Sequence, residues 1–287
     1  MKHFTLYQPQ IVMDVLKGIQ EDLGSGDITG QLIPESKQAE AKIITRETMI
    51  FCGQLWAEEV FNSINPTIMI QWHYAEGDEV PKDAVLCNIS GSARDILSGE
   101  RMALNFIQTL SAVSTKTHEY VQQVSGLNTV ILDTRKTIPG LRYAQKYAVY
   151  CGGGQNHRYG LYDAFLIKEN HIAASGSIKE VIQKARDLFP EKKLEIEIET
   201  LAQLKEAISA NPDIIMLDNF VQDDLKMVHE AIAIRAQLKA EETIKFEVSG
   251  NVNLGNIRKI AETGVDFISV GALTKNIQAI DLTLLLQ

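Results

Sequence analysis

The sequence predicts an α/β fold whose larger part is a parallel sheet closed into a barrel. From about residue 129 onward, short and fully apolar runs alternate with amphipathic helices. Strands that are apolar on both faces are typical of parallel sheets covered by helices. Polar residues follow the runs directly, as expected at the C-terminal mouth of a barrel. Because all the runs end in polar residues, a barrel is favoured over an open doubly wound sheet, which would concentrate such residues at one crevice.

Strand-like runs dominate the first hundred residues. Lys42–Thr48 and Thr67–Tyr74 are predicted strands, and the turn residues within Glu76–Gly91 predict a hairpin there. This last segment superficially resembles a swinging-arm carrier domain. However, its turn lysine, Lys82, follows proline and lacks the flanking methionines of such arms, so a plain hairpin is favoured. Ser98 is predicted to cap a long helix that carries an apolar stripe.

The second part of the chain contains six predicted strands separated by helices with recognisable ends. The predicted strands are Thr129–Leu132, Ala164–Ile167, Leu194–Ile198, Ile214–Leu217, Phe246–Val248 and Phe267–Val270. Ser177 and Thr200 are predicted helix caps, and Ser177 begins a capping box. Another predicted helix opens at Asn253 and closes at Gly264.

Composition narrows the class of partner and the compartment. The chain has 287 residues and a formal net charge of −9, so nucleic acid or an anionic membrane surface is an unfavourable partner for the whole molecule. No window approaches the roughly 18 apolar residues of a membrane span. The cysteines Cys52, Cys87 and Cys151 suit neither a zinc site nor a disulfide framework. We therefore expect free thiols and a cytoplasmic protein.

A cationic cluster stands out against this acidic background. Between Asp133 and His171 there are six lysines and arginines and three acids, a net charge of +3. Several of the cations fall at predicted strand ends or in the glycine-rich loop Cys151–Arg158. Arginines bind carboxylates and phosphates in bidentate fashion, and lysines supply a point charge to phosphate. The cluster predicts a polyanionic ligand.

Two acids and two glycine-containing turns refine this prediction. Glu197 and Asp218 lie on neighbouring predicted strands, where they could serve a Mg²⁺-bound diphosphate, a ribose diol, general acid–base chemistry or structural ion pairs. Ser249–Asn251 precedes a predicted helix, and Gly271-Ala272 follows the last strand. Turns at these places match the usual phosphate site of a barrel.

A series of longer motifs resembles one family. These motifs are Glu21–Thr29, Gly99–Asn105, Asp133–Arg142, Lys146–Val149, Gly152–Leu161, Leu166–His171, Met216–Phe220, Val248–Asn251 and Gly264–Thr274. In this order, and from about residue 20 to the end of the chain, they resemble quinolinate phosphoribosyltransferases, which are carboxylating nicotinate-nucleotide diphosphorylases of the type II phosphoribosyltransferase family. Tyr150 stands where some relatives have arginine, which alters the loop charge but no substrate position.

The resemblance implies a fold in two parts. One is an N-terminal α/β sandwich domain, expected over residues 1–104 and joined by the C-terminal segment 273–287. The other is an incomplete α/β barrel of about seven strands, expected over residues 105–272. Since six runs are visible in the sequence, the seventh strand is expected near Asn156–Tyr162 or merged with a neighbour.

The resemblance also implies a reaction and a set of residue roles. Quinolinate and phosphoribosyl pyrophosphate would give nicotinate mononucleotide, pyrophosphate and carbon dioxide in de novo NAD synthesis. The residues expected to bind quinolinate are Arg101, Thr134, Arg135, His157 and Arg158. The expected catalytic residues are Lys136, Lys168, Glu197 and Asp218. The same four are expected to bind phosphoribosyl pyrophosphate together with Ser249, Gly250, Asn251, Val270, Gly271 and Ala272.

A cofactor and an assembly are implied as well. Mg²⁺ would be held by Glu197 and Asp218, directly or indirectly. The chain would form a homodimer or a higher homo-oligomer, and Arg101 would reach across the interface into the partner's site.

Three other functions fit parts of the sequence. A paralogue of the same fold, such as the molybdenum-transport-associated relatives, would act on another substrate, but the arginine set Arg101, Arg135 and Arg158 favours a dicarboxylate. A barrel aldolase would use Lys136 or Lys168 as a Schiff-base nucleophile, which borohydride trapping would reveal. A non-catalytic phosphosugar-binding module would not need the paired acids.

Overall fold

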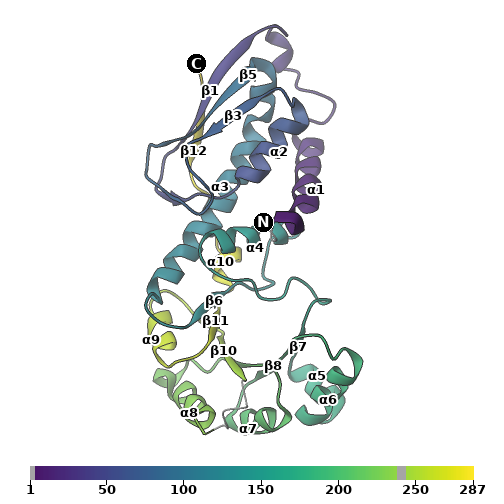
Figure 1. Ribbon diagram of the computed structural model, residues 1–287, viewed down its shortest axis with the longest axis vertical. Coiled ribbons are helices and arrows are strands. Elements are labelled where there is room, and N and C mark those ends of the chain that lie inside the picture. Colours follow the sequence, from purple (N-terminus) through teal and green to yellow (C-terminus); the bar gives the residue numbers. More distant parts are fainter. Residues whose placement is uncertain (1–3, 238–243) are drawn as a thin grey trace. The chain divides into compact units, whose positions relative to one another are not determined.

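The chain divides into two units in the computed structural model, which describes residues 4–237 and 244–287 (Figure 1). Unit 1 comprises residues 1–118, 137–153 and 273–287, and unit 2 comprises residues 119–136 and 154–272. The chain therefore passes between the two units several times. Residues 137–153 belong with unit 1 although they lie, in sequence, between segments of unit 2.

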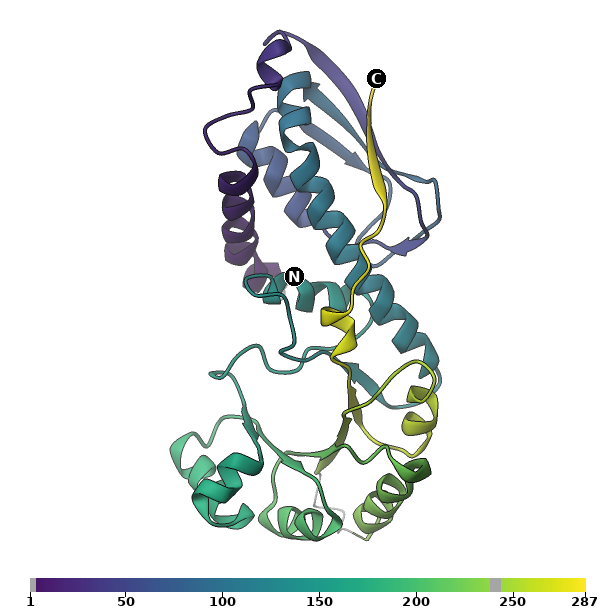
Figure 2. The same ribbon diagram turned by 180° about the vertical axis from the view of Figure 1, so that it is seen from behind.

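Unit 1 is built on a four-stranded antiparallel sheet with the strand order β12-β1-β5-β3. Its strands are β1 (Gln38–Thr45), β3 (Met69–Trp72), β5 (Val85–Ser92) and β12 (Leu282–Leu286). The C-terminal strand β12 pairs with β1, so the two ends of the chain contribute to one sheet (Figure 2). Ile43 on β1 and Leu86 and Ile89 on β5 are buried in the core of this unit.

The helices of unit 1 pack on this sheet and on one another. They are α1 (Phe4–Asp22), α2 (Gln54–Ile64), α3 (Ala93–Gln123, of which residues up to His118 belong here), α4 (Arg142–Cys151) and α10 (Ala272–Lys275), with a 3₁₀ turn at Gly30–Leu32. Trp56 on α2 is fully buried, and its indole N–H donates to the carboxylate of Asp14 on α1 at 3.1 Å. A two-stranded ribbon pairs β2 (Met49–Ile50) with β4 (Glu79–Val80).

Unit 2 contains a six-stranded parallel sheet in the order β6-β11-β10-β9-β8-β7. The strands are β6 (Val130–Leu132), β7 (Phe165–Ile167), β8 (Leu194–Ile198), β9 (Ile214–Asp218), β10 (Lys245–Ser249) and β11 (Phe267–Ser269). All six predicted strands are confirmed, with ends that differ by one residue at most. Their apolar residues are buried on both faces, which is why continuous runs predicted them.

The sheet curves into an incomplete barrel with helices on its outer side (Figure 1). The helices are α5 (Glu169–Ser175), α6 (Ile178–Leu188), α7 (Leu201–Ala210), α8 (Lys226–Arg235) and α9 (Ile257–Glu262), with a 3₁₀ turn at Asp223–Leu225. Ser177 and Thr200 cap α6 and α7 as predicted. In place of a seventh strand, Gln155 forms an isolated parallel bridge with Leu132 of β6, next to the predicted segment.

Three local predictions were wrong. Glu76–Gly91 does not form a hairpin, because β4 pairs with β2 while β5 pairs with β1 and β3. Ser98 does not cap a helix: α3 begins at Ala93, where the hydroxyl of Ser92 accepts from the amide of Asp95, and Ser98 donates to Asp27 at 2.8 Å.

The third error concerns Asn253, which does not open a helix. Its side-chain oxygen accepts from the amide of Gly255 at 2.9 Å and holds a turn, so that α9 begins only at Ile257. An asparagine that bonds to nearby backbone can hold a turn instead of starting a helix.

Candidate active site

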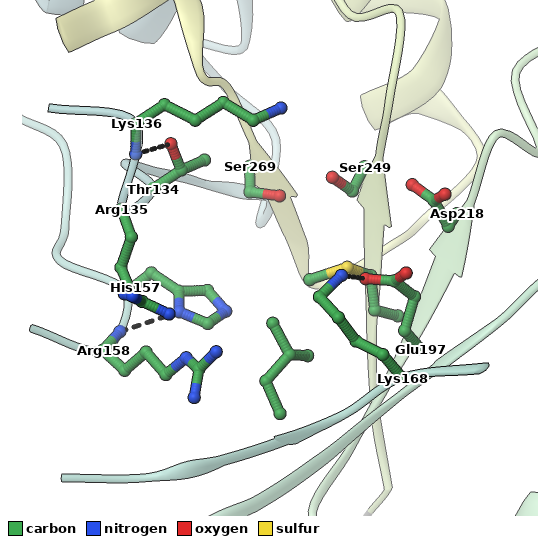
Figure 3. A pocket seen from close by; sticks show the side chains of 12 residues that line it. Thr134, Arg135, Lys136, His157, Arg158, Lys168, Glu197, Asp218, Ser249 and Ser269 are labelled. Atoms are coloured by element: carbon green, nitrogen blue, oxygen red, sulfur yellow. Dashed lines mark hydrogen bonds and ion pairs between the residues drawn. The ribbon is translucent and has the colours of Figure 1, made fainter. Parts of the chain in front are cut away.

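A cavity of about 310 Å³ lies within unit 2, at the C-terminal ends of the parallel strands (Figure 3). Its lining residues are Thr134, Arg135, Lys136, His157, Arg158, Leu166, Lys168, Glu197, Met216, Asp218, Ser249 and Ser269. Nine of these twelve are residues predicted from the sequence to form a site. The cavity has the size of a small-ligand pocket, and its place in the barrel is where parallel α/β sheets bind ligands.

One side of the cavity is a wall of cations. Arg135 and Lys136 follow β6 directly, and the hydroxyl of Thr134 accepts from the amide of Lys136 at 3.1 Å. Arg158 comes from the glycine-rich loop, and its guanidinium donates to the carbonyl of Ala164 at 3.3 Å. Burial lowers the pKa of Arg158, and the like charge of Arg135 lowers it further. A ligand that brings negative charge to these two arginines relieves this repulsion.

The opposite side carries the two predicted acids. Glu197 on β8 is 9% exposed and forms a short ion pair with the ammonium group of Lys168 (Figure 3). Asp218 ends the neighbouring strand β9. Burial raises the pKa of Asp218, whereas the charges of Lys168 and Lys136 oppose this rise. Both carboxylates therefore lie at the mouth of the barrel within reach of lysine charge.

The predicted phosphate turns lie next to the cavity, but only one of their described residues lines it. Of the first turn, Ser249 is among the described residues that line the cavity. The next two residues, Gly250 and Asn251, are not in the lining and have positive φ angles of 87° and 55°. A Cβ atom at Gly250 would lie 2.6 Å from the side-chain oxygen of Asn219, so only glycine fits. A Cβ atom at Gly271 would lie 2.9 Å from Cδ of Lys136, which places the second turn against this lysine. Val270 and Ala272 flank Gly271.

Arg101 belongs to the other unit. It lies on α3, its side chain is 61% exposed, and its guanidinium is 3.8 Å from the carboxylate of Glu100. It is absent from the described residues that line the cavity of unit 2.

Asp133 is a site residue that the sequence prediction missed as a functional group. It is fully buried and follows β6. Its carboxylate accepts from the backbone amide of His157 at 2.9 Å and from the side-chain amide of Asn156 at 2.7 Å. This acid therefore anchors the glycine-rich loop to the end of β6. The signal was present, since an acid directly after a fully apolar strand needs a hydrogen-bonding partner.

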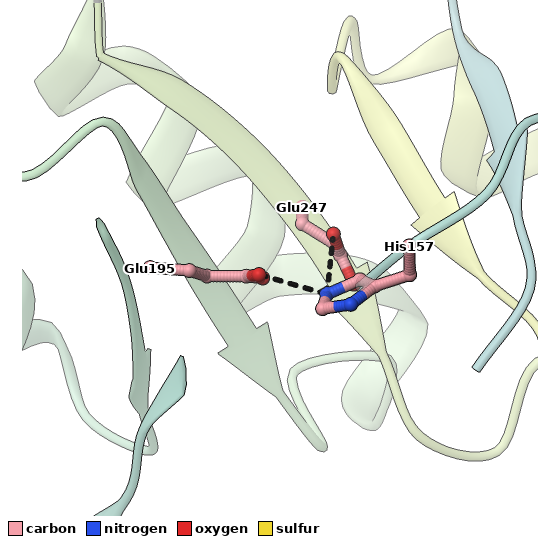
Figure 4. Close-up of side chains that lie close together, drawn as sticks. All are labelled: His157, Glu195 and Glu247. Carbon is pink, nitrogen blue, oxygen red and sulfur yellow. Dashed lines mark ion pairs between the residues drawn. The ribbon is translucent and has the colours of Figure 1, made fainter. Parts of the chain in front are cut away.

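Three ionisable side chains, one of them from the cavity lining, form a buried group (Figure 4). His157 Nε2 is 2.7 Å from a carboxylate oxygen of Glu195 on β8 and 3.8 Å from one of Glu247 on β10. Glu195 is 4% exposed and Glu247 is fully buried. Burial raises the pKa of Glu195 to about 7, and burial together with the nearby Glu195 raises that of Glu247 to about 8.

The spacing of two glutamates on β8 indicates part of this group from the sequence alone. Glu195 and Glu197 stand two residues apart on β8, so both point to the same face of the strand. Once Glu197 is placed in the barrel mouth, Glu195 must point into the barrel interior one layer below. A buried acid in that layer requires a partner, which His157 provides.

Comparison with known proteins agrees with this geometry. Residues 113–285 match the domain family described as quinolinate phosphoribosyl transferase, C-terminal domain. Residues 27–111 match the corresponding N-terminal domain. The chain belongs to the quinolinate phosphoribosyltransferase family.

Individual relatives of this family resemble the chain over most of its length. It is 42% identical over 265 residues to the probable nicotinate-nucleotide pyrophosphorylase [carboxylating] of Bacillus subtilis, covering 92% of this chain and 89% of the relative. It is 36% identical to the chloroplastic nicotinate-nucleotide pyrophosphorylase [carboxylating] of Arabidopsis thaliana, covering 93% and 80%. The solved nicotinate-nucleotide pyrophosphorylase of Francisella tularensis is 48% identical with a TM-score of 0.91, covering 97% and 96%.

The matched quinolinate phosphoribosyltransferase domains meet near residue 112, within α3. All residues that line the cavity fall in the C-terminal match, and Arg101 falls in the N-terminal one. Among the described helices, none is long and apolar enough to cross a membrane.

Proposed function

We propose that this chain transfers the phosphoribosyl group of phosphoribosyl pyrophosphate to quinolinate, releasing pyrophosphate and carbon dioxide and forming nicotinate mononucleotide. The supporting observation is the division of one cavity into two chemically different sides. Arg135 and Arg158 on one side suit a pair of carboxylates, and Lys168, Glu197 and Asp218 on the other suit a phosphorylated ribose. A relative from Nicotiana tabacum is named quinolinate phosphoribosyltransferase [decarboxylating], which supports quinolinate as one ligand and a phosphoribosyl donor, here phosphoribosyl pyrophosphate, as the other.

The proposed quinolinate side consists of Thr134, Arg135, His157 and Arg158. Two half-buried guanidinium groups that repel each other are stabilised by a ligand with two carboxylates, and a ligand with one leaves part of the repulsion in place. The cavity therefore favours a dicarboxylate over a monocarboxylate.

The proposed phosphoribosyl side consists of Lys136, Lys168, Glu197, Asp218 and the turns at Ser249–Asn251 and Val270–Ala272. When the bond between ribose C1 and pyrophosphate breaks, positive charge develops on the sugar ring. The carboxylates of Glu197 and Asp218 would favour that charge, and the lysines would stabilise the departing pyrophosphate. Positive φ at Gly250 and Asn251 turns the backbone after β10, which suits the binding of a phosphate by amide groups.

The chemistry after this step needs no covalent bond to the protein. The pyridine nitrogen of quinolinate forms the new bond to ribose C1 and becomes a pyridinium. The bond from C2 of the ring to its carboxylate then breaks, its electron pair stays at C2, and a proton takes the place of the lost carbon dioxide. The arginine wall would hold the second carboxylate and so orient the ring.

Mg²⁺ is part of the proposal as a group held by Glu197 and Asp218. The donor set fits, because Mg²⁺ commonly takes one or two carboxylates and completes its shell with water and substrate phosphate oxygens. Glu197 would then exchange its partner Lys168 for the ion. When bound, Mg²⁺ supplies positive charge to the leaving pyrophosphate.

The proposed assembly is a homodimer or a higher homo-oligomer in the cytoplasm. An arginine with 61% exposure, such as Arg101, is available to a neighbouring chain, and a third arginine would complete a dicarboxylate site. The three free cysteines are in keeping with a reducing compartment.

The test compares two pyridine substrates under identical conditions. The protein is incubated with phosphoribosyl pyrophosphate, Mg²⁺ and either quinolinate or nicotinate, and nicotinate mononucleotide is measured. The proposal expects product from quinolinate and at least about tenfold less from nicotinate, since one missing charged contact costs about 1.5–3 kcal/mol. Equal turnover of both, or trapping of a lysine by borohydride, would overturn it.

A further inference from the structure

The buried group formed by His157, Glu195 and Glu247 is here called the His157 cluster. His157 belongs to the proposed quinolinate side, whereas Glu195 and Glu247 have no role in the reaction described above. Its three side chains come from the glycine-rich loop and from strands β8 and β10 (Figure 4). The side chain of His157 is 11% exposed and that of Glu195 5%. Of the three, only His157 lines the cavity. Burying ionisable side chains costs stability, which suggests that these three residues have a role at the edge of the cavity.

The two ring nitrogens of His157 face different partners. Nδ1 accepts a hydrogen bond from the backbone amide of Arg158 at 2.7 Å. Nε2 lies 2.7 Å from a carboxylate oxygen of Glu195. A ring nitrogen that accepts from an amide carries no proton, so the ring hydrogen belongs on Nε2. Nε2 is the nitrogen in contact with Glu195, although this contact does not have the direction of an ordinary hydrogen bond. In this arrangement the imidazole is neutral.

This geometry limits what the histidine can do for an anionic ligand. A cationic imidazolium would need a proton on Nδ1, and that proton would oppose the amide hydrogen of Arg158 across 2.7 Å. In this arrangement Nδ1 is turned to Arg158, and Nε2 lies against Glu195 and is shielded from solvent. The contact of the ring with those two residues is the feature that bears on ligand binding.

Glu195 also acts on the charge of Arg158. Its carboxylate favours the charged form of this arginine, against burial and against the like charge of Arg135. Glu247 lies on the other side of Nε2, at 3.8 Å, and is fully buried. Glu247 interacts with the side chains of Ser269 and Glu195, although in the described part of the chain neither of its oxygens has a hydrogen bond of ordinary length and direction. Glu247 therefore packs behind the histidine and confines the ring to the side of Glu195.

We propose that His157, Glu195 and Glu247 are positioning residues for Arg158. Glu195 fixes the ring of His157, Glu247 closes the space behind it, and Nδ1 of the ring holds the backbone of Arg158, so that its guanidinium faces the dicarboxylate. Asp133 holds the loop from the other side, through the amide of His157 itself. The orientation of Arg158 toward a dicarboxylate rests on the proposed function. The position of the proton on the His157 ring does not depend on it.

The first experiment reads the ring directly and needs no substrate. The chain has six histidines, so protein labelled with ¹⁵N-histidine gives few side-chain signals, and His157→Gln identifies the one of interest. The expected result at pH 7 is an unprotonated Nδ1 and a protonated Nε2 in the resting protein. Glu195→Gln should change this signal and leave the other five in place. An imidazolium, or a proton on Nδ1, overturns the proposal whether or not the chain turns over quinolinate.

The second experiment separates positioning from catalysis. Glu195→Gln keeps the size of the side chain and removes its charge. The expected result is a rise of about tenfold in KM for quinolinate, corresponding to about 1.4 kcal/mol, with kcat changed less than about threefold and KM for phosphoribosyl pyrophosphate unchanged. Glu191→Gln is the matched control, because Glu191 is exposed, precedes the same strand and lies outside the cavity.

Outcomes of this second experiment are read together with the first. A fall in kcat with KM unchanged would assign Glu195 to the chemical step and overturn the positioning role. Unchanged kinetics would do the same. If Glu195→Gln does not fold, Glu247→Gln is measured in its place, with a smaller rise in KM for quinolinate expected. A wild-type protein without activity on quinolinate would refute the proposed function. The ¹⁵N-histidine experiment would then still test the predicted protonation of His157.

Discussion

Replacing Glu247 by glutamine is expected to change how stability depends on pH. Glu247 is fully buried on β10, and its pKa is raised to about 8 first by burial and then by the nearby charge of Glu195. In the unfolded chain a glutamate titrates near 4.5. Between these two values the folded state keeps the proton and the unfolded state loses it. The folded state of the wild type therefore loses stability as the pH rises through this window.

The size of this effect follows from the difference between the two pKa values. A difference of one unit is worth about 1.4 kcal/mol, so the window from 4.5 to about 8 corresponds to at most about 5 kcal/mol. Roughly 3 to 4 kcal/mol of this falls between pH 5 and pH 8. Glutamine has nearly the same shape and does not titrate. The free energy of unfolding of Glu247→Gln, minus that of the wild type, should therefore increase by this amount from pH 5 to pH 8.

Urea unfolding of both proteins at pH 5, 6, 7 and 8 measures this difference. Glu191→Gln again serves as the control, because Glu191 is exposed and lies outside the His157 cluster. A difference for Glu247→Gln that stays constant within about 1 kcal/mol would refute the reasoning. It would mean that the carboxyl group of Glu247 is protonated to the same extent in the folded and the unfolded chain over this pH range.

Three further predictions concern the cavity. Arg135→Ala should abolish quinolinate-dependent release of carbon dioxide while the circular dichroism spectrum is retained, and unchanged turnover would contradict its role. Gly271→Ala should raise KM for phosphoribosyl pyrophosphate about tenfold, because the new Cβ lies 2.9 Å from Cδ of Lys136, whereas an unchanged KM would remove this turn from the site. Mixing Arg101→Ala protomers with Lys136→Ala protomers should restore part of the activity through hybrid oligomers, and no recovery would argue against a shared site.

The sequence predicted the barrel well because its strands are buried on both faces. Each apolar run had the length of one strand, and most runs were followed by polar residues, several of which line the cavity. Lys168 and Asp218 were predicted from their places after apolar runs, and Glu197 from its place inside one, whereas the ion pair between Lys168 and Glu197 was not predicted. In this part of the chain, local pattern and tertiary position give the same answer.

The first hundred residues were harder, because their strands pair with distant partners. β4 and β5 are close in sequence and would suit a hairpin, yet their partners are β2 for one and β1 and β3 for the other. Nothing within Glu76–Gly91 specifies that choice. Helices α1 and α2 were not predicted either, because the sequence interpretation of this region identified strands only.

The His157 cluster shows a different limit. The role of His157 depends on which atoms its two nitrogens face, and Glu195 is 38 positions away in the sequence while Glu247 is 90 away. Spacing of this kind carries no local signal. The alternation in β8 could still have placed Glu195 inside the barrel, but only the folded structure brings it to His157.

The stoichiometry of the reaction tests the central claim most directly. Purified protein is incubated with Mg²⁺, phosphoribosyl pyrophosphate and quinolinate that carries a ¹⁴C label in its 2-carboxylate, and both labelled carbon dioxide and nicotinate mononucleotide are measured. Equal amounts of the two products, neither formed when phosphoribosyl pyrophosphate is omitted, are the predicted result. Carbon dioxide without the nucleotide, or neither product, would contradict the assignment.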